Sequence, residues 1–247
     1  MMRYAHIVGW GCYLPDRIVT NDELSTMVDT SDEWIYQRTG IRSRHIASTE
    51  ETTATLAFEA AARALKVADL HPSQVDLIIV ATSTPEYMFP STACKVQDYL
   101  GAGRAGAFDL SAACSGFVYA LQMAAQSIAT GSVRHAVVIG SETMSRVIDW
   151  QDRGTCVLFG DGAGAVVLSA ADTPGGGLGI ELTTEPQGAY MIWLPAGGAK
   201  SPPSAETIAR GEHYIRMEGR ETYRFATRTL AATALESVRK AGLEASD

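Results

Sequence analysis

The chain has little cysteine and no long apolar run, and each shortage excludes a class of protein. Four cysteines occur in 247 residues, and no two of them form a Cys-x-x-Cys pair. This spacing favours free thiols over a disulfide framework or a zinc site. No apolar run approaches the roughly 20 residues of a membrane-spanning helix. We therefore expect a protein that spans no membrane, binds no metal and keeps its cysteines reduced.

Positive charge is also scarce. The chain carries 20 Lys and Arg against 28 Asp and Glu, and its formal net charge is −8 at pH 7. Such an acidic protein has no bulk attraction to nucleic acid or to anionic membranes, so we expect neither as a partner. The N-terminal apolar residues are interrupted by His6, Gly9 and Gly11, unlike the apolar core of a signal peptide. A cytoplasmic location is the expectation that follows.

Apolar, β-branched runs alternate along the chain with helical patterns. The helical patterns cover residues 53–68, 92–100 and 114–130. The runs predict buried strands at 75–83, 105–110, 136–142, 163–170 and 179–185. Strands separated by helices indicate an α/β fold with a mainly parallel sheet covered on both faces.

A weak internal repeat and a glycine-rich joint indicate two parts. Residues 61–74 align with residues 234–247, although two unrelated amphipathic helices would explain this match equally well. The segment TPGGG at 173–177 predicts a joint. We therefore predict one half over residues 1–172 and the start of a second over 173–247. A strand follows the first copy of the repeat, so a chain that stops after the second copy is expected to be cut short.

Cys114 lies among very small side chains, where a predicted strand passes into a predicted helix in FDLSAACSGFVYAL. A helix N-terminus favours a thiolate, and small neighbours let a substrate carbonyl reach the sulfur while backbone N–H groups face the developing oxyanion. The pattern is typical of a nucleophile. A buried structural cysteine is the alternative that the local pattern leaves open, because cysteine is among the most buried residue types.

Four separated segments together resemble β-ketoacyl-acyl carrier protein synthase III, the initiating condensing enzyme of type II fatty acid synthesis. The segments are SDEWIYQRTGIRSRH at 31–45, TPEYMFPSTAC at 84–94, FDLSAACSGFVYAL around Cys114, and DRGTCVLFGDGAGAVVL at 152–168. The resemblance implies a thiolase-like fold, in which two similar α/β halves form a layered α-β-α-β-α core, with the second half incomplete here. It also implies a homodimer.

The resemblance further implies a reaction in two steps. A short acyl group, expected to be acetyl carried on coenzyme A, moves to Cys114, and malonyl-acyl carrier protein is then decarboxylated and condensed with it. Coenzyme A enters as a thioester substrate, so no permanently bound cofactor is expected. The family pairs its cysteine with the histidine and asparagine of a His-Gln-Ala-Asn motif. The 247 residues lack that motif, so this chain alone is expected to lack both partners.

The coenzyme A site implied by the resemblance involves Trp34, Arg38 and Arg153. An indole and a guanidinium can sandwich an adenine by stacking and cation–π contact, and arginine also binds phosphates. The alternatives are a partly buried helix anchor for Trp34 and an ion pair with Asp149 or Asp152 for Arg153.

The same resemblance assigns roles to five other residues. Phe89 would cross the dimer interface and close the end of the partner's acyl pocket, although an ordinary core phenylalanine is the alternative. Met217 and Gly219 would line the pantetheine tunnel. Arg224, with Arg220, would dock the acidic carrier protein, although a solvated helix face would also explain these arginines.

The five histidines are expected to have structural or solvated roles, and the glycine-rich FGDGAGA segment is expected to form a tight turn. An apolar run follows these glycines, so they do not open a helix as a dinucleotide-binding turn does. Two other functions remain open. The chain would then be a non-catalytic fragment that binds coenzyme A or another subunit, or a thiolase-fold relative that makes other thioesters.

Overall fold

The computed structural model describes residues 3–176 and 179–246, which group into two compact units. The first unit contains the described residues of 3–17, 45–143 and 161–176, and the second those of 18–44, 144–160 and 179–246. Each unit therefore combines three separate stretches of chain. The boundary expected near residue 172 remains a prediction.

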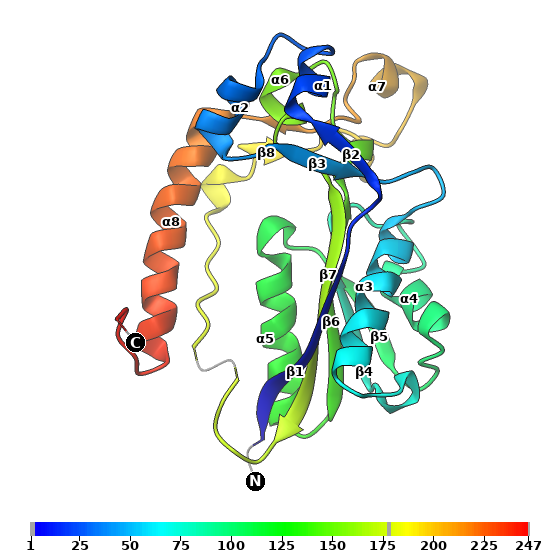
Figure 1. Ribbon diagram of the computed structural model, residues 1–247, viewed down its shortest axis with the longest axis vertical. Coiled ribbons are helices and arrows are strands. Elements are labelled where there is room, and N and C mark those ends of the chain that lie inside the picture. Colours follow the sequence, from blue (N-terminus) through cyan, green and yellow to red (C-terminus); the bar gives the residue numbers. More distant parts are fainter. Residues whose placement is uncertain (1–2, 177–178, 247) are drawn as a thin grey trace. The chain divides into compact units, whose positions relative to one another are not determined.

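A mixed five-stranded sheet forms the centre of the first unit (Figure 1), in the order β1-β7-β6-β4-β5. Strand β4 runs parallel to β5 and β6, whereas β7 runs antiparallel to β6 and β1. The strands are β1 (Tyr4–Tyr13), β4 (Leu77–Ala81), β5 (Gly106–Leu110), β6 (His135–Thr143) and β7 (Asp161–Ala171).

The prediction of a mainly parallel sheet is wrong for its β1–β7–β6 side. A parallel pair needs a long crossover, usually a helix, that returns the chain to the starting edge of the sheet. The connection from β6 to β7 contains only two short helical turns, η3 (Met144–Arg146) and α6 (Arg153–Cys156). The chain therefore enters β7 at the end of the sheet where β6 leaves it.

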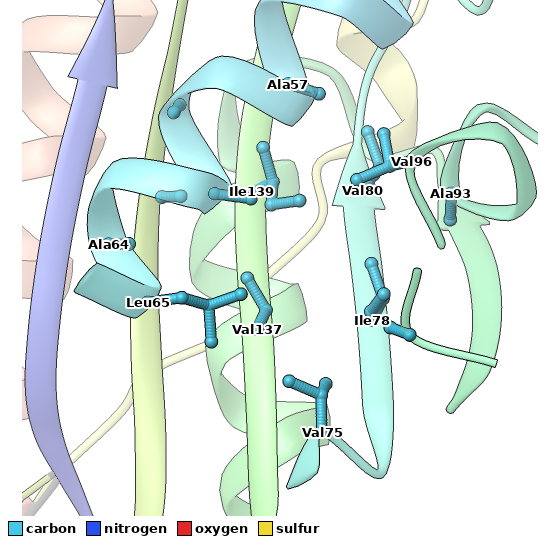
Figure 2. Packing of buried hydrophobic residues seen from close by; sticks show 14 of the residues in the cluster. Ala57, Ala64, Leu65, Val75, Ile78, Val80, Ala93, Val96, Val137 and Ile139 are labelled. Carbon is cyan, nitrogen blue, oxygen red and sulfur yellow. The ribbon is translucent and has the colours of Figure 1, made fainter. Parts of the chain in front are cut away.

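Helices cover both faces of this sheet, as predicted. Helices α3 (Thr53–Val67) and α4 (Thr92–Leu100) pack on one face, and α5 (Gly116–Ala129) packs on the other (Figure 1). Successive side chains of a strand point to opposite faces. On β6, Val137 and Ile139 therefore join the α3–α4 core (Figure 2), whereas Val138 joins the α5 core on the other face.

Helix α3 lies close to β1 because the contact is made of very small residues. The buried face of α3 includes Ala57, Ala60 and Ala64. Opposite them, a Cβ placed on Gly11 would lie 2.5 Å from the Ala60 carbonyl oxygen and 2.6 Å from the Ala64 nitrogen. No side chain fits between backbone atoms at these distances, so this position requires glycine.

The remaining elements are short, except for one long helix. Strand β2 (Arg17–Thr20) pairs with β3 (Ser43–Ile46), and β8 (Ile192–Trp193) pairs with β9 (Arg216–Met217). The α-helices are α1 (Asn21–Ser25), α2 (Asp32–Thr39), α7 (Ala205–Ala209) and α8 (Gly219–Lys240); the other helical turns are η1 (Pro72–Gln74), η2 (Ala113–Ser115) and η4 (Pro186–Gly188). No helix within residues 3–176 and 179–246 is long and apolar enough to cross a membrane.

The strand predicted at 179–185 does not form. This segment runs beside α8, where the Ser237 hydroxyl accepts a hydrogen bond from the Glu181 amide at 3.2 Å and Lys240 pairs with the Glu181 carboxylate. A strand needs a neighbouring strand to take its backbone hydrogen bonds. None of the described strands pairs with 179–185, and the helix supplies side-chain partners instead.

Candidate functional site

Cys114 lies in the tight turn between β5 and α5. The turn is η2, and its Ala113 has φ 46°, a left-handed conformation that is unfavourable for a residue with a Cβ atom. Helix α5 begins at Gly116, two residues later than predicted, so Cys114 precedes the helix instead of opening it. No side chain caps this helix start in the described structure, which leaves its first N–H groups beside the cysteine without a side-chain acceptor.

The four cysteines are free thiols, as predicted, but they differ in exposure. Cys12, Cys94 and Cys114 are exposed, whereas Cys156 is buried. Burial raises the pKa of the Cys156 thiol, and the nearby Asp152 carboxylate adds to this effect. A buried thiol held in its protonated form is a poor nucleophile. The alternative of a buried structural cysteine therefore applies to Cys156 and is wrong for Cys114.

The carboxyl ends of β4, β5 and β6 lie at one edge of the sheet and share a polar network. The Thr82 amide, just after β4, donates to the carbonyl of Leu110, the last residue of β5, at 3.2 Å. The Ser83 amide donates to Glu142 Oε1 of β6 at 2.7 Å. The turn that carries Cys114 follows Leu110 directly, so this network holds the strand end from which the turn departs.

Phe89 belongs to an exposed apolar segment between β4 and α4. The exposed fractions of Tyr87, Met88 and Phe89 are 54%, 75% and 82%. The alternative of an ordinary core phenylalanine is therefore wrong within this chain. Three consecutive exposed apolar side chains are unusual and indicate a surface that another molecule covers.

Trp34 contacts both arginines that were predicted to lie near it. The N-cap Ser31 accepts a hydrogen bond from the Trp34 amide at 3.1 Å and so fixes the start of α2. The guanidinium carbon of Arg38 lies 4.4 Å from the Trp34 ring centroid, and that of Arg153 lies 4.8 Å from it. Both distances fall in the range of cation–π contacts.

Arg153 also has an anionic neighbour, but it is not one of the two expected. Its Nη1 donates to the Asp29 carbonyl oxygen at 2.7 Å and lies 3.8 Å from the Asp29 carboxylate. Asp152 instead caps α6, accepting from the Gly154 amide at 2.8 Å. An ion pair with Asp149 or Asp152 was therefore the wrong alternative.

Arg44 and Asn21, which sequence reasoning missed, link the elements that carry this cluster. The buried Arg44 guanidinium donates to Asn21 Oδ1 at 2.8 Å and to the Val157 carbonyl, just after α6, at 3.2 Å. Asn21 in turn donates to Asp32, the first residue of α2, at 2.8 Å. One buried cation thus connects the elements that carry Trp34 and Arg153. Burial lowers the pKa of this guanidinium.

Thr30 is a second residue that sequence reasoning missed. Its hydroxyl oxygen is buried and has no hydrogen-bond partner among the residues that the structure describes. It lies between Asp29, which contacts Arg153, and Ser31, which caps α2. An unpaired polar atom at this place is suited to a polar ligand. The only signal in the sequence is its position directly before SDEW.

The residues expected at the tunnel and the docking surface lie around the start of α8. Met217 ends β9 and Gly219 begins α8; a Cβ placed on Gly219 would lie 3.6 Å from the Met217 methyl carbon. Arg220 and Arg224 are both exposed, and Arg224 pairs with Glu221 at 3.1 Å.

Four of the histidines hydrogen-bond to other groups of the protein, whereas the buried His213 Nδ1 has no hydrogen-bond partner among the described residues. No group of three or more potential metal-ligating side chains occurs in the part of the chain that is described. The contacts are His6 with the Thr173 carbonyl, His45 with the Pro15 carbonyl, His71 with Ser73, His135 with Ser169, and His213 with the ring of Tyr214.

Comparison with known proteins identifies the family. The model of 3-oxoacyl-[acyl-carrier-protein (ACP)] synthase III matches residues 108–186, which include Cys114 and Arg153. The β-ketoacyl-[acyl-carrier-protein] synthase III of Desulfitobacterium hafniense is 51% identical over 241 residues, or 98% of this chain and 73% of that protein. The chain belongs to the β-ketoacyl-acyl carrier protein synthase III family. The synthase III of Caldanaerobacter subterraneus is 49% identical, with 98% and 73% covered.

Solved synthase III structures share the fold. That from Aquifex aeolicus superposes with a TM-score of 0.86 at 44% identity, covering 97% of this chain and 72% of the other. That from Pseudomonas aeruginosa gives 0.89 at 38% identity, covering 99% and 73%. The predicted thiolase-like fold and the predicted enzyme class, an acyltransferase, are confirmed.

Proposed function

We propose that the chain catalyses the condensation of a short-chain acyl-coenzyme A, with acetyl as the expected primer, and malonyl-acyl carrier protein. The product is 3-oxoacyl-acyl carrier protein, and the reaction initiates fatty acid synthesis. The observation that carries this proposal is the exposed Cys114 in a strained turn before an uncapped helix, within a synthase III chain. The test supplies both substrates to the purified, complete product of the gene. Mass spectrometry should find acetoacetyl-acyl carrier protein, and its absence would contradict the proposal.

In the first step, the Cys114 sulfur attacks the thioester carbonyl of acyl-coenzyme A. A carbon–sulfur bond forms, the bond to coenzyme A breaks, and coenzyme A leaves as a thiol after taking up a proton. The negative charge that builds on the carbonyl oxygen needs nearby donors, and the backbone N–H groups at the start of α5, which no side chain caps, are of the required kind. The acyl group then remains on the enzyme as a thioester of Cys114.

In the second step, malonyl-acyl carrier protein loses carbon dioxide, and the resulting carbanion attacks the acyl-cysteine carbonyl. A carbon–carbon bond forms, the bond to sulfur breaks, and Cys114 is regenerated. We assign no residue of this chain to the decarboxylation. The histidines make the contacts described above, and none is proposed as a catalytic partner.

We propose that Trp34, Arg38 and Arg153 bind the adenine and phosphates of coenzyme A, with the Thr30 hydroxyl as a polar contact. Trp34→Ala and Arg153→Ala should each weaken coenzyme A binding by about 1–2 kcal/mol, because a desolvated stacking or charge contact is lost. Calorimetry measures the change. Tyr36→Ala is the matched control, because it removes another arginine–aromatic pair of α2, in which Arg42 lies 3.8 Å from the ring centroid. Equal losses in all three variants would argue against the assignment.

We propose a homodimer formed through the β5 edge. Strand β5 is an edge strand of the sheet, and no other described strand pairs with its outer side, so its backbone groups there can pair with a strand of another chain. Its Phe108 is 38% exposed, and Asp109 of the same strand contacts the end of the segment that carries Phe89. Phe89 would then reach the partner's acyl pocket, and a bulky ring there favours short primers. A monomer mass in sedimentation equilibrium would refute this arrangement.

We propose that Met217 and Gly219 line the pantetheine path and that Arg220 and Arg224 dock the acidic carrier protein. Exposed cations on an otherwise acidic chain are suited to an acidic partner. Charge reversal of Arg220 should then raise the KM for malonyl-acyl carrier protein and leave the KM for acetyl-coenzyme A unchanged. We also propose that the enzyme acts in the cytoplasm, with acyl-coenzyme A as substrate and no resident cofactor. Cell fractionation and mass spectrometry of the native protein test these two points.

A further inference from the structure

The loop between β4 and α4, residues 82–91, is held at both ends by carboxylates from neighbouring strands. Glu142 of β6 binds the beginning of the loop, and Asp109 of β5 binds the residues that follow its end. The loop carries Tyr87, Met88 and Phe89 at its exposed centre. Strands β6 and β5 of the central sheet therefore anchor the two ends of the loop that carries these apolar side chains.

Asp109 uses both of its carboxylate oxygens to hold the start of α4. Its Oδ2 accepts a hydrogen bond from the Thr92 amide at 2.7 Å, and its Oδ1 accepts one from the Ala93 amide at 2.7 Å. The N-cap Ser91 accepts from the Cys94 amide at 3.2 Å. The first three N–H groups of α4 are thus all paired, and both carboxylate oxygens of Asp109 are in use. A carboxamide here would turn its NH₂ group toward a backbone N–H, so one of the two bonds would be lost.

Glu142 and its neighbours fix the other end of the loop. Glu142 accepts from the Ser83 amide at 2.7 Å and from the Thr84 hydroxyl, and Thr84 Oγ1 itself accepts from the Thr143 amide at 2.9 Å. Within the loop, the Glu86 amide donates to Thr92 Oγ1 at 3.3 Å. The beginning, middle and end of the loop therefore each have a polar attachment, whereas Phe89 is 82% exposed.

We propose that Asp109, assisted by Glu142, is a positioning residue that sets primer chain length. It does so by fixing the loop that presents Phe89 to the partner's acyl pocket. This inference rests on the role proposed above for Phe89. Asp109 itself contacts no substrate. Losing a hydrogen bond between Asp109 and the start of α4 lets the loop move, so that the Phe89 ring withdraws from the pocket. The pocket then accepts a longer acyl chain.

The test compares primers in the full chain as its gene encodes it. The rate of Cys114 acylation is measured by intact-protein mass spectrometry with acetyl-coenzyme A and with hexanoyl-coenzyme A. Asp109→Asn should lower the ratio of acetyl to hexanoyl rates by about tenfold, a typical range for a change in apolar pocket size. Asp76→Asn is the matched control. Asp76 Oδ2 accepts from the Arg134 and His135 amides at 2.8 and 3.0 Å, but it lies just before the opposite end of β4, so the ratio should not change.

Phe89→Ala separates this inference from the function on which it rests. An unchanged primer ratio in Phe89→Ala overturns the role of Phe89 and the inference with it. A lowered ratio in Phe89→Ala, together with an Asp109→Asn ratio equal to that of Asp76→Asn, overturns the inference alone. If Asp109→Asn does not fold, Glu142→Gln serves instead, because it removes one acceptor and keeps the other. A ratio in Glu142→Gln that equals the unsubstituted protein's would also overturn the inference.

Discussion

Replacing Cys114 by alanine should abolish the acetyl adduct that the protein forms with acetyl-coenzyme A. The adduct is a thioester, so it cannot form without the sulfur, and removing a nucleophile costs at least about 10³-fold in rate. Intact-protein mass spectrometry, followed by peptide mapping, measures the adduct and its position.

Exposure alone does not distinguish Cys114, because Cys12 and Cys94 are also exposed. Cys12→Ala and Cys94→Ala are therefore the controls, and both should keep the adduct at its original rate. Cys12 lies within β1 and Cys94 in the first turn of α4, where Ser91 already caps the helix. An adduct that persists in Cys114→Ala, or that maps to another cysteine, would refute the assignment of the nucleophile.

Replacing Gly11 by alanine should destabilise the fold by at least about 3 kcal/mol, at the upper end of what overpacking costs. The added methyl group would meet the backbone of α3, which cannot move aside as a flexible side chain can. For a chain of this size, the midpoint of thermal unfolding should fall by roughly 6–12 °C. Differential scanning calorimetry measures this midpoint.

The matched control is Gly164→Ala, because Gly164 lies in β7 opposite Cys12, the neighbour of Gly11. A Cβ on Gly164 would meet no atom within 4 Å. Its free energy of unfolding should therefore change by less than about 1 kcal/mol. Similar losses in both variants would show that glycine matters here for a reason other than the approach of α3.

Apolar periodicity predicted helices α3 and α4 closely, and local capping residues mark the same helix ends in the structure. The side chain of Thr52 caps the start of α3, and Ser91 caps that of α4. Gly101 ends α4 with φ 69°, a conformation that glycine adopts readily. These signals lie within a few residues of the helix ends, so no tertiary information was needed.

The strand directions and the supporting residues could not be predicted in the same way. The direction of β7 depends on the path of the chain after β6. An apolar run does not indicate whether the strand will be parallel or antiparallel to its neighbour. Arg44 contacts Val157, and Glu142 contacts Ser83, across long stretches of sequence. A single sequence holds no mark of such pairings, whereas the nucleophile and the tryptophan lie in recognisable local motifs.

The pairing of β1 with β7 has a consequence for the order in which the protein folds. Tyr4 pairs with Ala171, so the strand that the ribosome makes first within this sheet must wait for the strand made last. Closing so long a loop is slow, and an unpaired apolar strand can meanwhile bind to the wrong chain. The parallel strands β4, β5 and β6 lie closer together in the sequence and can assemble earlier. The nascent chain is therefore expected to be most open to misassembly between the emergence of β1 and that of β7.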